Sequence, residues 1–266
     1  MTFALGPALL FCPADRPDRY AKAAQRSPAV ILDLEDAVAP ADKAAAREAL
    51  LAQPLDPART IVRVSAVGSE DFAADLAALQ KTRYRTVMLA KASSAEHVDS
   101  LRGYEVIALC ETAAGVLAAP SIAAHPFVVA LMWGAEDLVA SLGGTGSRDP
   151  SGRYREVASH ARAAVLLAAG AHGKAAIDAV HVAIDDLDGL AAEAEDAAAS
   201  GFAASACIHP GQVEVILGAY RPSPDDVAWA RAVIAASEGQ NGAFRFQGRM
   251  IDEPVLRHAA EVLRRE

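Results

Sequence analysis

Eight short apolar runs recur along the 266-residue chain, and each is followed by an alanine-rich amphipathic stretch. This alternation is the βα rhythm of a parallel sheet. Eight such units favour an α/β fold of the closed (β/α)8 TIM-barrel type over an open doubly wound sheet. The seventh run is the weakest strand prediction. The runs lie at residues 8–12, 30–34, 60–64, 86–89, 106–110, 128–133, 174–178 and 204–208.

The length fits one large domain with a C-terminal helical extension. Hydrophobic residues make up 53 % of the chain but aromatic residues only 5 %, so the core must be aliphatic and rich in alanine, which favours helices. From about residue 240 the pattern changes to a loop, a short structured piece and a final helix. We therefore predict a barrel domain at residues 1–238 and an extension at residues 239–266.

Charge and cysteine usage exclude several classes of protein. A formal net charge of -9 argues against a nucleic-acid binder, although one local basic patch could still serve an anionic ligand. Three cysteines without a CxxC pair indicate neither a disulfide framework nor a zinc ribbon, and favour the reducing cytoplasm. No signal peptide is evident, and no uncharged apolar run approaches the ~20 residues of a membrane span.

Charged residues stand where the second and third runs end. Asp33 and Glu35 share one side of the second strand, and Asp36 follows them. Arg63 lies inside the third apolar run, where an unpaired guanidinium is costly. Asp33 or Glu35 on the neighbouring strand is the expected partner. Arginine also suits a two-point grip on a substrate carboxylate.

Two further acids follow the fifth and sixth runs. Glu111 stands at the tip of the fifth strand, and Glu136 and Asp137 lie just beyond the sixth. Glu111 and Asp137 are one βα unit apart and can converge over the barrel mouth. Two carboxylates without Cys or His suit a hard octahedral cation, Mg²⁺ or Mn²⁺. Gly134 and Ala135 leave room for backbone N–H groups to bind a substrate carboxylate.

Structural roles compete with these functional ones. A single acid at a strand end is more often a helix cap or a solvated charge, and an Arg in a strand is usually an ion-pair partner. Glu136 fits a helix-start charge, and His209 fits a turn residue beside Pro210 better than a ligand. The combination favours function, because acids and an Arg stand at the same end of the second, third, fifth and sixth strands.

Ordered fragments of the sequence resemble the CitE-like branch, the citrate lyase β-subunit-like proteins, of the HpcH/HpaI aldolase/citrate lyase superfamily. The resemblance covers essentially the whole chain, and the ordered set is specific although each fragment alone is weak. The fragments are FCPADRPDRYAKA, VILDLEDAV, TIVRVSA, MLAKASS, ALCETAAG, MWGAEDL, CIHPGQ and GRMIDEPVLRHA.

The resemblance implies a TIM barrel with a divalent metal, usually Mg²⁺, and coenzyme A as part of the substrate. It implies reversible carbon–carbon cleavage of a short 3-hydroxyacyl-CoA thioester, such as malyl-, citramalyl- or hydroxymethylglutaryl-like CoA. The products would be a 2-oxo acid or ketone and a shorter acyl-CoA. The partners expected are these small molecules and further copies of the chain, in a homotrimer or a multiple of one.

The resemblance also assigns roles to residues. Glu111, in the ETxxG position, and Asp137, in the GxxDL position, would be metal ligands. Arg63 falls on the substrate-gripping Arg and would stabilise the developing oxyanion. Glu35 and Asp36 fall on the acids that orient this Arg and metal-bound waters.

More distant positions complete the expected site. Asp252 resembles the acid that related lyases place in a neighbouring subunit's site, which implies a trimer and an extension that packs on its neighbour. We expect Asp252 to exchange the proton of the acyl-CoA methyl group. Arg16 and Lys22, and on weaker grounds Lys43, are candidates for binding the CoA phosphates.

One departure concerns the end of the fourth strand. Many relatives read Pro-Lys-x-Glu there, whereas this chain reads Ala90-Lys91-Ala92-Ser93. Lys91 is kept, but the missing Glu argues against a local Lys–Glu pair.

Three alternatives stay open at this stage. The chain could be the citryl-carrier-protein lyase β-subunit of a citrate lyase complex, although it is compact for that role. It could be a catalytically inactive thioester-binding protein, although the kept charges argue against this. A phosphoenolpyruvate-type barrel enzyme is the third, but no glycine-rich phosphate loop follows the last two strands.

Overall fold

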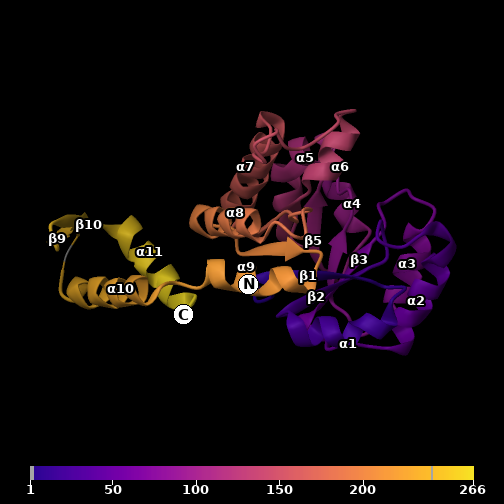
Figure 1. The fold of residues 1–266 in the computed structure, drawn as a ribbon, viewed down its shortest axis with the longest axis horizontal. Coiled ribbons are helices and arrows are strands. Elements are labelled where there is room, and N and C mark those ends of the chain that lie inside the picture. The colour runs from indigo at the N-terminus through magenta and orange to yellow at the C-terminus, as the bar shows by residue number, and fades with distance from the viewer. Residues whose placement is uncertain (1–2, 241) are drawn as a thin grey trace. The chain divides into compact units, whose positions relative to one another are not determined.

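The computed structural model describes residues 3–240 and 242–266. The chain forms two compact units, the first ending at Ile216 and the second spanning Leu217–Glu266. Figure 1 shows the order of their elements along the chain.

The first unit is a closed barrel of eight parallel strands in sequential order, which confirms the predicted TIM barrel. The seventh strand, the weakest prediction, pairs with both of its neighbours and closes the ring. The strands are β1 (Ala8–Pro13), β2 (Ala29–Asp33), β3 (Thr60–Val64), β4 (Thr86–Leu89), β5 (Glu105–Cys110), β6 (Val128–Trp133), β7 (Ala175–Asp178) and β8 (Ala204–Cys207).

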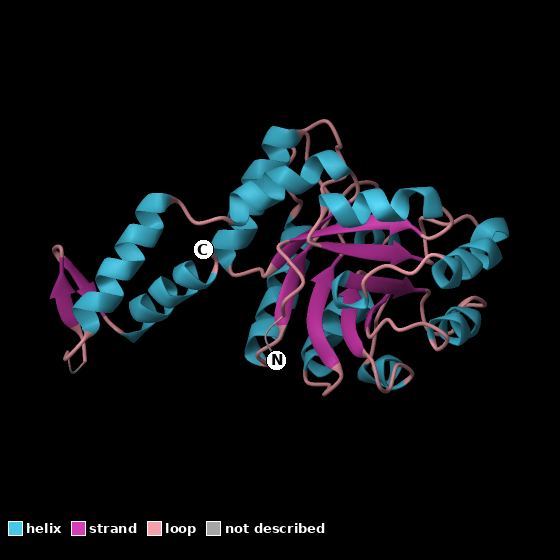
Figure 2. Cartoon of the chain, turned by 90° about the horizontal axis from the view of Figure 1, so that it is seen from below, coloured by secondary structure: helices cyan, strands magenta, loops and turns pink. Residues whose placement is uncertain are grey.

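Helices cover the outer face of the barrel (Figures 1 and 2). Alanine at their inner faces keeps them close to the strands; Ala158, Ala161 and Ala169, for example, are buried on α7. The helices up to the end of the barrel are α1 (Pro17–Arg26), α2 (Lys43–Ala52), α3 (Phe72–Leu79), α4 (Ala95–Asp99), α5 (Ala113–Ala123), α6 (Ala135–Ser141), α7 (Glu156–Ala171), α8 (Leu187–Ser200) and α9 (Pro210–Tyr220), which continues past the unit boundary at Ile216, with 3-10 turns at Pro40–Asp42 and Pro57–Arg59.

The barrel interior is filled by small and aliphatic side chains that alternate along each strand. Because side chains alternate, the residue two positions after an inward-facing core residue also faces inward, and at the strand ends this residue lies at the barrel mouth. Ile31 is followed by Asp33, Ile61 by Arg63, Leu109 by Glu111 and Met132 by Gly134. The interior cluster contains Leu9, Ala29, Ile31, Ile61, Met88, Ile107, Leu109, Ala130, Met132, Ile177, Ala204 and Ala206.

The second unit is a helical hairpin with a short antiparallel ribbon, α10 (Pro224–Ser237), β9 (Phe244–Phe246), β10 (Arg249–Ile251) and α11 (Glu253–Arg264). Figure 2 shows the ribbon at one end of the hairpin, where the chain passes from the first helix to the second. A capping box between Ser223 and Asp226 starts α10. Because α10 packs on α11, the observed division follows Ile216 and differs from the predicted one after residue 238.

The three cysteines are free and buried. Burial raises the pKa of the Cys12 thiol to about 11 and the pKa of Cys110 and Cys207 to about 12. These side chains are therefore protonated core residues rather than nucleophiles. Across residues 3–240 and 242–266, the helices are all too short or too polar to span a bilayer.

Candidate active site

Arg63 is fixed at the barrel mouth by Asp33 on the adjacent strand. The two residues are in register between β2 and β3, and Nε and Nη2 of Arg63 donate to the two carboxylate oxygens of Asp33, each at 2.6 Å. The same carboxylate accepts the N–H groups of Glu35 (2.9 Å) and Ala37 (3.1 Å). Burial alone would lower the pKa of Arg63, but Asp33 outweighs it and the pKa rises above its ordinary value. The guanidinium is therefore permanently charged and held in one orientation.

Lys91 links the acids that follow β2. Its ammonium group forms ion pairs with Glu35 and, at 2.9 Å, with Asp36. Burial raises the pKa of Glu35 against the opposing effect of Arg63 and Lys91. Burial also acts to raise the pKa of Asp36, but the hydrogen bond from Lys91 outweighs it and lowers that pKa. Lys91 thus has no local Glu partner of the Pro-Lys-x-Glu kind but pairs instead with a Glu from the loop after β2.

Glu111 is a buried carboxyl group with few contacts that would stabilise its negative charge. It is 2 % exposed, and its Oε1 accepts the backbone N–H of Lys91 at 3.0 Å. Burial and then the nearby Asp137 raise the pKa of Glu111 to about 8. A Cβ at position 134 would lie 2.9 Å from both Cβ and Oε2 of Glu111, so Gly134 is needed for this close approach. The two acids predicted to meet do lie near each other.

These residues line one small cavity of about 170 Å³, which we call the mouth cavity. Its charged part contains Arg63, Asp33, Glu111 and Asp137, and its apolar part continues the barrel core. Glu136 also lines the cavity and accepts a hydrogen bond from Ser147 at 2.5 Å. The remaining lining residues are Phe11, Ala37, Leu109, Met132, Gly134, Ala135, Val180 and Ile208.

The donor set in the mouth cavity fits a hard divalent cation. Glu111 and Asp137 provide carboxylate oxygens, and burial together with the neighbouring Asp137 raises the pKa of Glu111, so a cation between the two acids would stabilise its anion. A search of the described residues finds no group of three or more His, Cys, Asp or Glu side chains placed for a metal. Mg²⁺ needs only one or two carboxylates, since water and substrate oxygens complete its octahedron.

The candidates for CoA phosphates do not line the mouth cavity. Arg16 is exposed immediately before α1 and pairs with Asp18 at 3.2 Å, and Lys22 is exposed in the middle of that helix. The ammonium of Lys43 donates to the carbonyl groups of residues 34 and 35, at 2.7 and 2.9 Å. Lys43 therefore stabilises the loop after β2 through these two hydrogen bonds.

Asp252 belongs to the second unit, where it caps α11. Its carboxylate accepts the backbone N–H of Val255 at 3.4 Å. This local role gives a structural reason for an Asp at this position.

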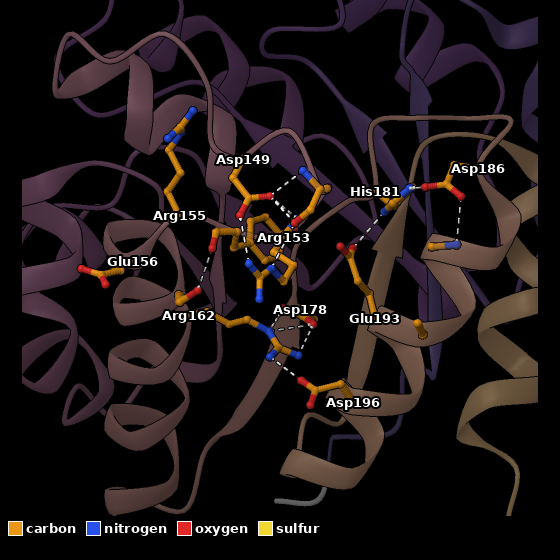
Figure 3. Close-up of a pocket in the computed structure, with 16 residues that line it drawn as sticks. Asp149, Arg153, Arg155, Glu156, Arg162, Asp178, His181, Asp186, Glu193 and Asp196 are labelled. Atoms are coloured by element: carbon orange, nitrogen blue, oxygen red, sulfur yellow. Dashed lines mark hydrogen bonds and ion pairs between the residues drawn. The ribbon is translucent and has the colours of Figure 1, made fainter.

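The sequence analysis missed a larger polar cavity of about 810 Å³ between the loop after α6 and the helices α7 and α8, the α7–α8 cavity (Figure 3). In it, Arg162 pairs with Asp178 at 2.8 Å and with Asp196 at 2.6 Å, and Trp133 donates to Asp178 at 2.5 Å. His181 lies between two further acids, Glu193 at 2.9 Å and Asp186 at 3.3 Å. Of these charged residues, Asp178 alone stands at the end of a predicted strand, the seventh, where a site residue would be expected.

A family model described as HpcH/HpaI aldolase/citrate lyase matches residues 8–210. The chain belongs to this family. The sequence resemblance is therefore confirmed.

Among solved structures, the fold matches CitE from Mycobacterium tuberculosis in complex with magnesium, acetoacetate and coenzyme A. The TM-score is 0.94 at 57 % identity, and the match covers 98 % of each chain. The (3S)-malyl-CoA thioesterase of Cereibacter sphaeroides is 36 % identical over 79 % of this chain and 75 % of its own. The mitochondrial citramalyl-CoA lyase of Homo sapiens is 33 % identical over 86 % of this chain and 76 % of its own.

Proposed function

We propose that the protein is a Mg²⁺-dependent carbon–carbon lyase that acts on a short 3-hydroxyacyl-CoA thioester. The observation that carries this proposal is the mouth cavity, which combines a fixed guanidinium with two neighbouring carboxyl groups, one of which, Glu111, is buried and has a raised pKa. The magnesium and coenzyme A bound by the CitE homologue, and the name of the citramalyl-CoA lyase, support the same chemistry.

Glu111 and Asp137 are the residues that would hold the cation, which when bound supplies Lewis-acid stabilisation of an oxyanion. Arg63 binds the carboxylate of the 2-oxo acid and stabilises the negative charge that develops on its carbonyl oxygen. Asp33 keeps the guanidinium aimed at that position, so no reorganisation is needed when the charge develops. One such group is worth ~3–4 kcal/mol in the transition state.

The rest of the mouth cavity orients the substrate. The backbone of Gly134 and Ala135 lines it and offers N–H groups to a carboxylate, with Glu136 at its edge. Leu109 and Met132 form an apolar floor that excludes water from the carbon–carbon bond. Only a small 2-oxo acid fits a cavity of about 170 Å³, so the CoA part must extend outside it.

The proton exchanged at the acyl-CoA methyl group is assigned to Asp252 of a neighbouring copy, within a homotrimer. Its half-buried carboxylate at the start of α11 makes only one long hydrogen bond, at 3.4 Å, among the described residues. Mixing Asp252→Ala with Arg63→Ala protein tests the sharing. Mixed trimers should regain part of the wild-type activity, because some sites then combine an intact Arg63 with an intact Asp252. Mixtures without activity would count against it.

Two placements support the remaining assignments. Arg16, at the N-cap of α1, and Lys22, on that helix, are both exposed and can meet CoA phosphates outside the mouth cavity. The three buried free thiols agree with a cytoplasmic enzyme.

Hydrolysis of the thioester is the second candidate, favoured by the malyl-CoA thioesterase among the relatives. A panel of malyl-, citramalyl- and hydroxymethylglutaryl-CoA, assayed with Mg²⁺ or with EDTA, separates the two activities. A lyase yields acetyl-CoA with glyoxylate, pyruvate or acetoacetate, whereas a thioesterase yields free CoA and the hydroxy acid. Turnover that EDTA leaves unchanged, or no turnover of any thioester, would overturn the lyase proposal.

A further inference from the structure

Lys91 holds an unusual position between the strands. It follows β4 with φ of +50°, a left-handed conformation that costs a non-glycine residue free energy. Its neighbours are tied to both adjacent strands, since the N–H of Ala90 donates to Val64 at 3.3 Å and that of Ala92 to Leu109 at 3.0 Å. A Cβ on Gly115 would lie 2.4 Å from the Ala92 carbonyl, so α5 also closes on this turn. The surrounding structure therefore imposes the conformation of Lys91.

From this fixed point, the ammonium group reaches acids from opposite sides of the barrel mouth. It pairs with Glu35 and Asp36 after β2, and lies 3.7 Å from Asp137 on α6. The side chain is 30 % exposed. Burial alone would lower its pKa, but the hydrogen bonds that it donates to Glu35 and Asp36 outweigh burial and raise the pKa above the ordinary value. Lys91 is thus a charged link between the loop after β2 and the start of α6.

Glu35 is shared between two cations. Its Oε1 takes the ammonium of Lys91, while its Oε2 accepts the N–H of Asp36 at 2.8 Å and lies 3.3 Å from Nη1 of Arg63. Within the described part of the chain, Nη1 makes no hydrogen bond, whereas Nε and Nη2 of Arg63 are both used by Asp33. Nη1 is therefore the nitrogen of Arg63 that remains available to donate to a bound anion.

We propose that Lys91 is a positioning residue that keeps Glu35 from pairing fully with Arg63 and so leaves the Nη1 edge open for the substrate carboxylate. This inference rests on the proposed function, because it assumes that Arg63 binds the 2-oxo acid. Carboxylates prefer short, charge-assisted contact with a guanidinium. Without Lys91, Glu35 would close on Nη1, and a substrate carboxylate would have to displace it.

Binding of pyruvate, the simplest 2-oxo acid probe, tests this role without an activity assay. We expect Lys91→Met to raise the pyruvate Kd of the Mn²⁺-loaded protein about tenfold in calorimetry, the loss of one charge-assisted hydrogen bond. Mn²⁺ affinity, followed by electron paramagnetic resonance, should change much less. Lys91→Gln serves as a second variant if Lys91→Met does not fold, and Lys91→Arg should stay close to the wild type.

Two double variants separate positioning from net charge. Glu35→Gln added to Lys91→Met should restore pyruvate affinity, because a neutral amide does not compete for Arg63. Asp36→Asn added to Lys91→Met restores the same net charge but should not restore affinity, since Asp36 pairs with Lys91 and not with Arg63 in the described structure.

Equal rescue by both double variants, or wild-type pyruvate affinity in Lys91→Met, would overturn the inference. Wild-type protein that binds Mn²⁺ but no pyruvate would overturn it together with the assignment of Arg63. Wild-type protein that binds no Mn²⁺ points instead to a failure of the proposed metal site, so the two failures are distinguishable.

Discussion

The mouth cavity and the α7–α8 cavity both collect buried charges, but they balance them differently. In the α7–α8 cavity, Asp178 pairs with Arg162 and accepts a hydrogen bond from Trp133, and His181 is flanked by two acids, so the buried charged groups of this wall are paired with one another (Figure 3). In the mouth cavity, the carboxyl group of Glu111 accepts only a backbone N–H among the residues that the structure describes, and its pKa is raised to about 8.

If the active site were chosen by cavity size alone, the α7–α8 cavity would be preferred to the mouth cavity that we propose. The α7–α8 cavity has about 810 Å³ and the mouth cavity about 170 Å³. Buried charges that are paired with one another have a structural role, whereas a buried acid without an ion-pair partner can bind a cation. The comparison therefore teaches why we propose the mouth cavity as the reactive site: the criterion is a buried acid without an ion-pair partner rather than volume.

Loss of either proposed metal ligand should have the largest effect. Glu111→Gln and Asp137→Asn should each abolish metal-dependent turnover, since removing one of two protein ligands leaves the cation to water and substrate alone. Product formation from the thioester panel is the measurement, and the thermal midpoint shows that each variant is folded. Normal rates in both variants would remove the basis for distinguishing the two cavities.

Arg63→Ala should lower kcat about 10²–10³-fold, as expected when a preorganised group at a developing oxyanion is lost. Thioester affinity should change less, because the CoA part binds elsewhere. The variant also leaves buried Asp33 unpaired, so Arg63→Lys, which keeps the charge but not the two-point contact, is the matched control. If only thioester binding collapsed, Arg63 would belong to the CoA site.

The α7–α8 cavity should respond in stability rather than activity. Arg162→Met leaves Asp178 without its guanidinium and should cost about 3–5 kcal/mol of unfolding free energy. Turnover at a temperature where the variant is folded should stay near that of the wild type. Urea unfolding and the lyase assay measure the two effects. A folded but inactive Arg162→Met protein would show that the α7–α8 cavity takes part in function.

The smallest effect expected is a pH dependence of stability in metal-free protein. The pKa of Glu111 is raised to about 8 by burial and then by Asp137, from an ordinary value of 4.5. Between these values the folded state binds more protons than the unfolded state, so this group's contribution to stability falls as the pH rises. Urea unfolding in EDTA at pH 6 and pH 8 should show the fall, and Glu111→Gln should lack it.

Much of the barrel could be predicted because its signals are local. The apolar runs predicted the eight strands to within a residue or two at each end, and the predicted Arg63 pairing with Asp33 or Glu35 is confirmed. The meeting of Glu111 and Asp137 followed from their place at successive strand ends. In each case strand alternation and βα order were enough.

The rest depends on contacts distant in sequence. The role of Lys91 could not be predicted, because its partners Glu35 and Asp36 lie 56 and 55 residues away and its positive φ leaves no mark in the sequence. The partner of Asp178 is on a helix that precedes it, 16 residues away. The packing of α10 on α11 could not be predicted, because the sequence pattern of a helix does not reveal which element it packs against.

Metal binding tests the central claim most directly. Mn²⁺ titration followed by electron paramagnetic resonance measures it on wild-type protein, Glu111→Gln, Asp137→Asn and, as control, Arg162→Met. The account predicts one bound ion per chain in the wild type and in Arg162→Met, and loss of that ion in the other two variants. Equal Mn²⁺ binding by all four proteins, or none by the wild type, would contradict it.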